Sequence, residues 1–274
     1  RSVAQLFYST NSGGRRPRGE TVLFLDDDIL CPPDLLTQHL AAIQAFGPIS
    51  AFGPVLTAPE SPDSLAADMI DQFYKERDQR LSTNPEPMWP RFSAGNANTS
   101  VPLSFLHATG GFDEHFTGAR DDWDLGMRLW KMGLRFRFLP TAVTHQIHVK
   151  PSEISVRRDA VAAGRNDILL CGKHPEYRPY SLPARFNLGP VWKAVLREVI
   201  VRSPVSMEPL VRIPYSVSHV LRRVPGVRYL GVKLLQLRIG INMWRAAMAQ
   251  IGSRVRIPGE GERDSGANVK SIPG

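Results

Sequence analysis

The fold is decided by one short stretch of the sequence, Thr21-Val22-Leu23-Phe24-Leu25-Asp26-Asp27-Asp28. Its first five residues form an uncharged, mainly apolar run, which is typical of a strand buried on both faces in a parallel sheet. Three aspartates follow directly at the carboxyl end of that strand. Open α/β sheets bind their ligands beyond this edge. The stretch therefore predicts an α/β domain with a ligand site at its aspartates.

Helices and strands alternate along the rest of the chain. A helix is expected over 34–46, after two prolines, and a strand over 49–56, which completes a βαβ unit. The later expected elements are helices over 64–81, 103–109, 121–132 and 152–174, and a strand over 135–139. Between them, residues 93–98 are small and polar, which suits a close approach of the backbone rather than a packed element.

The aspartates after the first strand suit a divalent cation. Asp26 and Asp28 project to the same side of an extended chain, and their oxygens are hard ligands that suit Mg²⁺ or Mn²⁺. Like charges this close repel, and a bound cation relieves that repulsion. The alternative is that Asp27 or Asp28 only caps a turn before the following prolines.

A second acidic group, Asp121, Asp122 and Asp124, stands at the start of the 121–132 helix. The helix dipole and helix capping favour acids there without any chemistry. A carboxylate held rigidly and ionised at a helix start also has what a general base requires. Farther on, His145 or His148 could complete an oxygen-rich metal shell, although single histidines are more often structural.

Taken together, these motifs resemble a GT-A glycosyltransferase of family 2. The resemblance covers about residues 21–177, and it rests on the segments Phe24–Ile29, Ser93–Asn96, Gly110–Glu114 and Asp121–Leu129, with Gly133 and His145. It implies an α/β core of the Rossmann-like GT-A type with a mostly parallel sheet. A basic α-helical extension would follow that core.

The resemblance also implies a role for each site residue. Asp122 would be the catalytic base, and Asp121, standing where the family more often has Glu, would lie on the acceptor side with Trp123 and Asp124. The metal, Mn²⁺ or Mg²⁺, would be held by Asp26, Asp28 and His145, with His148 as the reserve candidate. The donor and its diphosphate would contact Asp26, Asp27, Gly95 and Asn96.

The implied reaction is an inverting transfer of a sugar from a nucleotide-sugar donor to an acceptor hydroxyl. The acceptor would be a glycan or a lipid-linked molecule of the cell envelope. Two other functions stay open at this stage. The chain could be a non-catalytic remnant or subunit that binds a glycan or a partner, or it could use the same acids for nucleotidyl transfer.

The region before the first aspartate is short for this family. Only 25 residues precede Asp26, whereas a further βαβ unit needs about 30. We therefore expect the nucleotide-recognising half of the core to be incomplete in this chain. An excerpt of a longer protein, a partner chain and a true loss would each account for it.

The positive charge is concentrated near the carboxyl end. The chain has 34 Lys and Arg against 26 Asp and Glu, and residues 191–257 hold twelve of these cations with two acids, a net charge of +10. An apolar stripe from Leu230 to Met248 indicates a helix that lies on an anionic membrane surface or docks on the catalytic domain. No nucleic-acid-binding module is recognisable there.

These patterns predict three regions and a location. We expect a catalytic domain over 1–180, a basic helical extension over 181–257 and a disordered tail over 258–274. The two cysteines, Cys31 and Cys171, form no disulfide framework, and no apolar run approaches the ~20 residues of a spanning helix. A cytoplasmic protein is expected, peripheral on the inner face of the cell membrane through residues 191–257.

Overall fold

The structure is a computed structural model. It describes residues 6–7, 19–86, 97–147, 153–181 and 223–255, together with eight positions between 184 and 220. Four of the predictions made from sequence lie outside the described residues: those for Gly95, Asn96, His148 and the tail over 258–274. The division of the chain near residue 180 stays a prediction.

The catalytic core contains a sheet of five described strands. Their order is β1 (Leu6–Phe7), β2 (Thr21–Phe24), β6 (Thr99–Pro102), β4 (Ile49–Phe52) and β7 (Arg135–Phe138). All four residues of β2 are buried, as the apolar run predicts. The expected strand over 135–139 is also present, as β7. The α/β class is therefore confirmed.

The sheet is more mixed than the expected, mostly parallel one. β2 pairs in parallel with β1 and β4 with β7, but β6 runs antiparallel to both β2 and β4 at the centre. Two of the four residues of β6 are Thr99 and Ser100, so no apolar run marked it as a strand. Its polar groups are satisfied inside the sheet, for example by the bond from the Ser100 hydroxyl to the Ala51 carbonyl, at 3.3 Å.

The strand expected over 49–56 is divided between two sheets. Its first half is β4, and its second half begins β5 (Val55–Thr57), in a small sheet ordered β3 (Ile29–Leu30), β8 (Thr144–Gln146), β5. The break falls at Gly53-Pro54. A Cβ on Gly53 would lie 2.1 Å from the Ala142 carbonyl oxygen, so this approach requires glycine. Sequence periodicity carries no sign of such a break.

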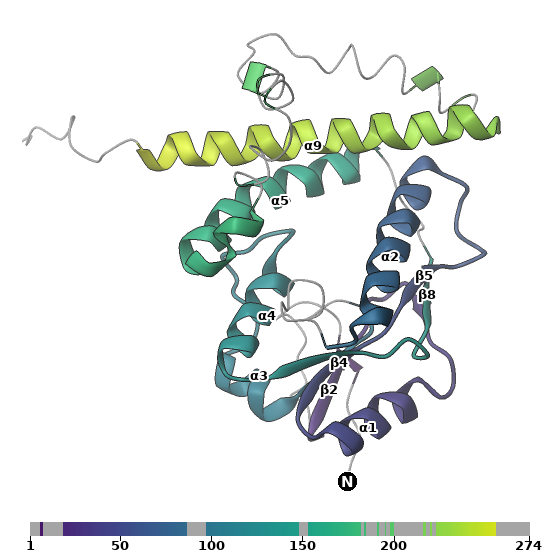
Figure 1. Cartoon of the computed structure of the whole chain (residues 1–274), viewed down its shortest axis with the longest axis vertical. Coiled ribbons are helices and arrows are strands. Elements are labelled where there is room, and N and C mark those ends of the chain that lie inside the picture. Colours follow the sequence, from purple (N-terminus) through teal and green to yellow (C-terminus); the bar gives the residue numbers. More distant parts are fainter. Residues whose placement is uncertain are drawn as a thin grey trace, which may run out of the picture.

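The predicted helices are confirmed with small shifts at their ends. They are α1 (Leu35–Phe46), α2 (Leu65–Thr83), α3 (Leu103–Thr109), α4 (Asp121–Lys131) and α5 (Glu153–Lys173), followed by a 3₁₀ turn, η1 (Pro175–Tyr180), and by α9 (Pro225–Val255). Figure 1 shows α9 lying across the end of the domain farthest from the sheet, where α2 and α5 both reach it. The main core lies between the sheet and α4, around Phe24, Phe52, Leu125, Leu129 and Phe138.

Asn98 joins three segments at the edge of the sheet where the strands end. Its backbone N–H donates to the Phe24 carbonyl at 2.9 Å, and its carbonyl accepts from Gly53 N–H at 3.1 Å. Its side-chain amide donates to the carbonyls of Pro54, at 3.1 Å, and Ala142, at 2.7 Å. The side chain is buried and the backbone φ is 69°, a left-handed conformation that asparagine tolerates.

His39 of α1 completes this buried network. Its Nε2 lies 2.9 Å from the Asn98 amide oxygen and its Nδ1 lies 2.8 Å from the Ser100 hydroxyl. Burial lowers the pKa of His39, so the ring is neutral. Because the amide oxygen can only accept, Nε2 carries the proton and Nδ1 accepts from the hydroxyl. The network ties α1 to the strands that end at the acidic loop.

The first prediction concerns Asn98. We expect Asn98→Ala to lower the free energy of unfolding by about 3 kcal/mol, because it leaves two buried carbonyls and the His39 N–H without their partner. Denaturant unfolding followed by circular dichroism measures the effect. The control is Asn84→Ala at an exposed helix end, expected to change stability by less than ~0.5 kcal/mol. Equal effects in the two variants would contradict the assignment.

Candidate active site

The loop that follows β2 carries the first acidic group. Leu25 is buried, and the chain then turns, with Ile29 N–H donating to the Asp26 carbonyl at 3.2 Å. The Asp28 carboxylate accepts from the Gln146 amide of β8 at 3.0 and 3.2 Å. The Asp28 carbonyl also accepts from Ile147 N–H at 2.9 Å. β8 therefore fixes the end of the loop.

Asp26 has an unusual electrostatic environment. Burial raises its pKa to about 6, and the negative charges of Asp28, Asp27 and Asp121 raise it further toward that value. The contribution of Asp121 is informative, because that residue begins α4, far away in sequence. The fold therefore brings the two acidic groups close enough to repel each other.

The second acidic group begins α4. Arg120, in a left-handed conformation with φ of 72°, immediately precedes the helix and turns the chain into it. Protein surrounds most of the Asp122 carboxyl, although some of its surface stays accessible. That burial raises the pKa of Asp122 to about 7, aided by the charge of Asp121 and opposed by Arg120. A carboxylate with this pKa is well suited to accept a proton near neutral pH.

Helix α5 holds the loop that leads into α4. The Asn166 side-chain amide donates to the carbonyls of Thr117 and Ala119, at 3.1 and 2.7 Å. The next residue, Asp167, is buried and lies 3.5 Å from the Arg120 Nε. These contacts position the residues just before the aspartates. The sequence contains no local signal for them, because they join segments about fifty residues apart.

Trp123 packs within the first turn of α4. The guanidinium of Arg120 lies over its ring, 3.9 Å from the centroid, and the Tyr177 ring meets it edge-on at 5.8 Å. Trp123 therefore helps to hold Arg120 beside the acids. Its expected contact with an acceptor stays a prediction.

Asp124 lies deeper than the acceptor side for which it was predicted. Its side chain has no exposed surface, and its oxygens accept from Arg128 at 2.8 Å, His174 at 2.8 Å and Lys173 at 2.8 Å. Burial acts to raise its pKa, but these partners prevail and leave the pKa below its usual range. The structure thus places this carboxylate in the packing of α4 against α5 and η1, where no acceptor reaches it.

The glycines at 110 and 111 belong to the same support. Arg128, held by Asp124, also donates to the carbonyls of Thr109 and Gly111, each at 2.7 Å. Asp113, in the segment that follows, accepts from Lys173 at 2.6 Å. This motif therefore links the end of α3 to α4 and α5.

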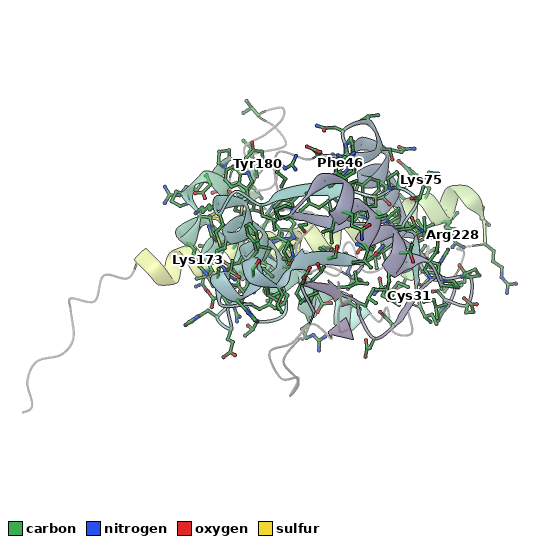
Figure 2. The ribbon with its side chains drawn as sticks, turned by 90° about the horizontal axis from the view of Figure 1, so that it is seen from below. Cys31, Phe46, Lys75, Lys173, Tyr180 and Arg228 are labelled. Carbon is green, nitrogen blue, oxygen red and sulfur yellow. The ribbon has the colours of Figure 1, made fainter. Side chains whose placement is uncertain are left out.

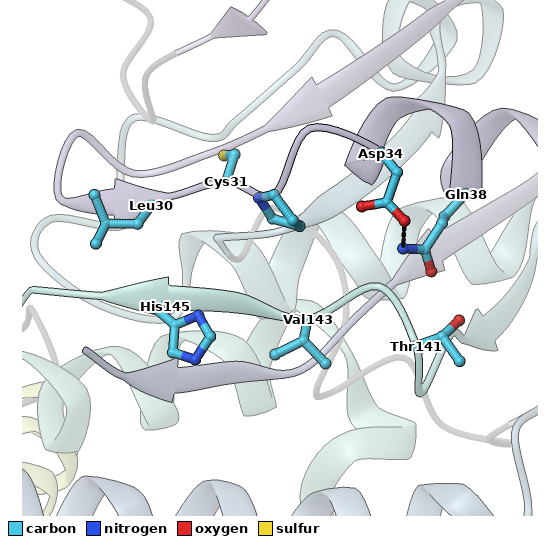
Figure 3. A pocket seen from close by; sticks show the side chains of 8 residues that line it. Leu30, Cys31, Asp34, Gln38, Thr141, Val143 and His145 are labelled. Carbon is cyan, nitrogen blue, oxygen red and sulfur yellow. Dashed lines mark hydrogen bonds between the residues drawn. The ribbon is translucent and has the colours of Figure 1, made fainter. Parts of the chain in front are cut away.

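His145 is not beside the aspartates. Successive residues of a strand face opposite sides of the sheet, and Gln146 is the residue of β8 that faces Asp28. His145 instead lines a pocket of about 410 Å³ on the other side of the small sheet, with Cys31, Asp34 and Val143 (Figure 3). Its predicted role as a metal ligand is therefore not supported by where it lies, and the reserve candidate His148 is outside the described residues.

The sequence pattern of the family described as "Glycosyl transferase family group 2" matches residues 21–163. This is more than half of the chain, and it contains both acidic groups. The chain belongs to this family. It carries a glycosyltransferase domain, as the resemblance of its motifs implied. No curated protein matches the sequence at a significant level.

Two solved structures are examples of what this glycosyltransferase domain resembles. TarS from S. aureus, in complex with UDP-GlcNAc, shares 12% identity with a TM-score of 0.40, over 86% of this chain and 69% of that one. The mannosyltransferase PcManGT from Pyrobaculum calidifontis, in complex with GDP-Man and Mn²⁺, shares 15% identity with a TM-score of 0.48, over 88% of this chain and 64% of that one. Likenesses this remote are not evidence for a shared donor or metal.

The acidic loop of the glycosyltransferase domain fits a divalent cation in one particular way. No group of three or more His, Cys, Asp or Glu among the described residues is arranged to hold a metal by itself. Mg²⁺, however, is often bound by one or two carboxylates together with substrate phosphates and water. Asp26 and Asp28 match that kind of site, because their oxygens are hard ligands and the charge at Asp26 is poorly compensated.

Tyr74 of α2 is a residue of this region that sequence reasoning missed. Burial raises the pKa of its hydroxyl; the Arg77 charge lowers it, while those of Asp26 and Asp122 raise it. Arg77 lies 4.5 Å from the centroid of the Tyr74 ring. The hydroxyl is therefore protonated at neutral pH and close to both acidic groups. An aromatic residue on an amphipathic helix gives no sequence signal for such a place.

The second prediction concerns Asn166. We expect Asn166→Ala to lower the free energy of unfolding by about 1–3 kcal/mol, because two carbonyls of the loop before α4 lose their donor. Thermal unfolding measures this change. The matched control is Asn242→Ala, which removes one bond to the Arg238 carbonyl within α9. A larger loss in the control would show that Asn166 does not hold the loop.

Proposed function

We propose that this chain transfers a sugar, with inversion, from a nucleotide-sugar donor to an acceptor hydroxyl. The observation that carries the proposal is the meeting of two acidic groups, one of which contains a carboxyl with a pKa of about 7. The family to which the domain belongs supports sugar transfer in general. Inversion, the metal and the residue roles are our proposals.

Asp122 acts as the base in this mechanism. Its carboxylate accepts the proton of the acceptor hydroxyl as that oxygen attacks the anomeric carbon of the donor sugar. The bond from the anomeric carbon to the diphosphate breaks on the opposite side, so one displacement inverts the configuration. The α4 dipole and Arg120 support the ionised form of Asp122, while burial and Asp121 keep its pKa high enough to take a proton.

Asp26 and Asp28 form the donor side. They would hold Mn²⁺ or Mg²⁺, which as a Lewis acid neutralises charge on the departing nucleoside diphosphate. Gln146 orients Asp28 through two hydrogen bonds from its amide. We further propose that the acceptor is a glycan or lipid-linked molecule of the cell envelope, and that the protein works in the cytoplasm at the inner face of the membrane.

The third prediction tests the base. Asp122→Asn should reduce turnover roughly 10²–10⁴-fold with little change in donor affinity, because the amide keeps the shape but cannot accept the proton. The purified protein is incubated with Mn²⁺, a panel of nucleotide sugars and candidate acceptors, and nucleoside diphosphate release is measured. The control is Asp159→Asn, an exposed residue of α5, expected to be active.

Three outcomes of this assay would count against the proposal. Undiminished turnover in Asp122→Asn would remove the assignment of the base. Release of pyrophosphate instead of nucleoside diphosphate would indicate nucleotidyl transfer. Donor binding without turnover in the wild-type protein, across the whole panel, would favour a binding protein that has lost the reaction.

The fourth prediction is a pH dependence. Asp122 works as a base only when ionised, and its pKa is raised to about 7. kcat/KM should therefore be constant above about pH 8 and fall about tenfold for each pH unit below 7. Initial rates between about pH 5 and 9 at fixed Mn²⁺ measure the profile. A rate unchanged down to about pH 5 would show that a group with an ordinary carboxyl pKa is the base.

The fifth prediction concerns the metal. Asp28→Asn should raise the Mn²⁺ concentration needed for half-maximal activity at least tenfold, as expected when a charged ligand is lost. His145→Ala should leave it nearly unchanged, because that ring lies on the other face of β8. Mn²⁺ binding followed by electron paramagnetic resonance gives a readout independent of turnover. Equal effects in the two variants would contradict the placement of His145.

A further inference from the structure

The exposed apolar side chains of this protein are concentrated outside the catalytic domain. Among the described residues, fifteen large apolar side chains are exposed, and nine of them lie between 191 and 237. We call these nine residues the outer apolar face: Val191, Val195, Val199, Val217, Val220, Val224, Tyr229, Leu230 and Leu237. Single exposed apolar residues are common, but a concentration of this kind marks an interaction site.

The valines of this face recur at helical spacing. Val191, Val195 and Val199 are helical, are separated by four residues each, and are 79%, 57% and 61% exposed. Val217 and Val220 are also helical and exposed, and they are three residues apart. Residues three or four apart share one side of a helix. Each set is therefore an apolar stripe that points away from the packed protein.

Helix α9 has apolar residues on two sides. Val232 and Leu235 are buried against Leu65 and Ala66 of α2. Farther along, the backbone of α9 passes so close to α5 that a Cβ on Gly164 would lie 2.0 Å from the Met243 carbonyl oxygen. The helix is thus docked on the catalytic domain, as one of the two sequence interpretations held.

The predicted stripe of α9 is not the side that docks on α2. Its first member, Leu230, and Leu237 are exposed, as is Tyr229. In Figure 1 the short helical pieces with the valine stripes lie beyond α9, on the side away from the sheet. Docking therefore accounts for one apolar side of α9, and the outer apolar face needs another partner.

An ion pair shows that α9 is held firmly enough to present this face. Arg228 donates to Asp68 of α2 at 2.6 and 2.7 Å and to Asp63 at 2.7 Å. These contacts lie near the start of the helix, at the right of Figure 2. Only this cation among the basic residues of the described part of α9 is paired with both of these acids. The charge of the extension is therefore not consumed by the catalytic domain.

We propose that the outer apolar face binds the surface of an anionic lipid bilayer. Its chemistry is complementary to that surface, because exposed apolar stripes enter the boundary of the acyl chains while surrounding cations attract anionic headgroups. Residues 191–257 supply these cations, with a net charge of +10. Among the described residues, no helix is both long and apolar enough to cross a bilayer.

This inference adds a partner to the proposed function without depending on it. The valine stripes, rather than α9 alone, make the contact, and α9 connects them to α2 and α5. These two helices flank the acidic groups, so binding would hold the catalytic domain at a set distance from the lipid surface. Access to a lipid-linked acceptor is a consequence that rests on the proposed transfer reaction.

The experiment is vesicle co-sedimentation of the purified chain. The wild-type protein should pellet with vesicles of phosphatidylcholine and phosphatidylglycerol, and much less with phosphatidylcholine alone or in about 0.5 M salt. Val195→Asp/Val220→Asp should reduce binding to the anionic vesicles at least tenfold, because each acid removes apolar contact and repels the headgroups. Both positions are exposed, so folding should be unchanged, as judged by thermal unfolding.

The matched control adds the same charge elsewhere. Leu36→Asp/Leu56→Asp changes two exposed residues of the catalytic domain and should bind vesicles like the wild type. Wild-type protein that stays in the supernatant, or equal loss in both double variants, would overturn the proposal. So would a wild-type dimer that only the valine variant dissociates, because the face would then join two copies.

The catalytic proposal is tested separately. Asp122→Asn should pellet with the anionic vesicles as the wild type does, and the valine variant should retain activity on a water-soluble acceptor. Vesicle binding by a chain without any turnover would leave this inference standing while the proposed function fails. Turnover without vesicle binding would give the reverse result.

Discussion

The buried amide of Asn98 is the contact on which the site depends. It joins the end of β2, the break between β4 and β5, and the turn at Ala142 through four hydrogen bonds of its own. Phe24, one of its partners, stands two residues before Asp26. The position of the acidic loop therefore follows from a polar group placed among otherwise apolar strands, where an unmet hydrogen bond would be costly.

The first turn of α4 divides its acids between structure and chemistry. Asp124 is surrounded by Arg128, Lys173 and His174, so its charge is neutralised and its pKa is lowered. Asp122 has its pKa raised to about 7 by burial and by Asp121. The helix dipole acts on both, so the difference comes from the side chains that α5 and η1 bring to one of them.

Helix α9 connects the site to the extension. It packs on α2, which carries Tyr74, and on α5, which holds the loop before Asp122. Its other side belongs to the outer apolar face. A single long helix thus bears on both walls of the acidic region and on the surface proposed to bind lipid. This arrangement reconciles the two interpretations of its apolar stripe, because docking on the domain leaves a second side available.

Local signals in the sequence determined the class of the fold and the groups with reactive side chains. The uncharged run of β2, the helical periodicities and the acids at 26–28 and 121–124 each lie within a few residues of one another, so they could be read without knowledge of long-range contacts. The family match confirms the interpretation of those motifs. What the sequence could not determine depends on pairing between distant segments.

The tertiary structure decided the parts that only distant contacts create. β6 is a polar strand stabilised by neighbours on both sides, so no run of its own marked it. The pairing of β8 with β3 makes Gln146, and not His145, face Asp28, because one position along a strand reverses the side chain. Likewise, Asp122 and Asp124 look alike in sequence. Burial and the cations brought by α5 and η1 make one a base and the other a structural anchor, because electrostatic environment is a property of the folded chain.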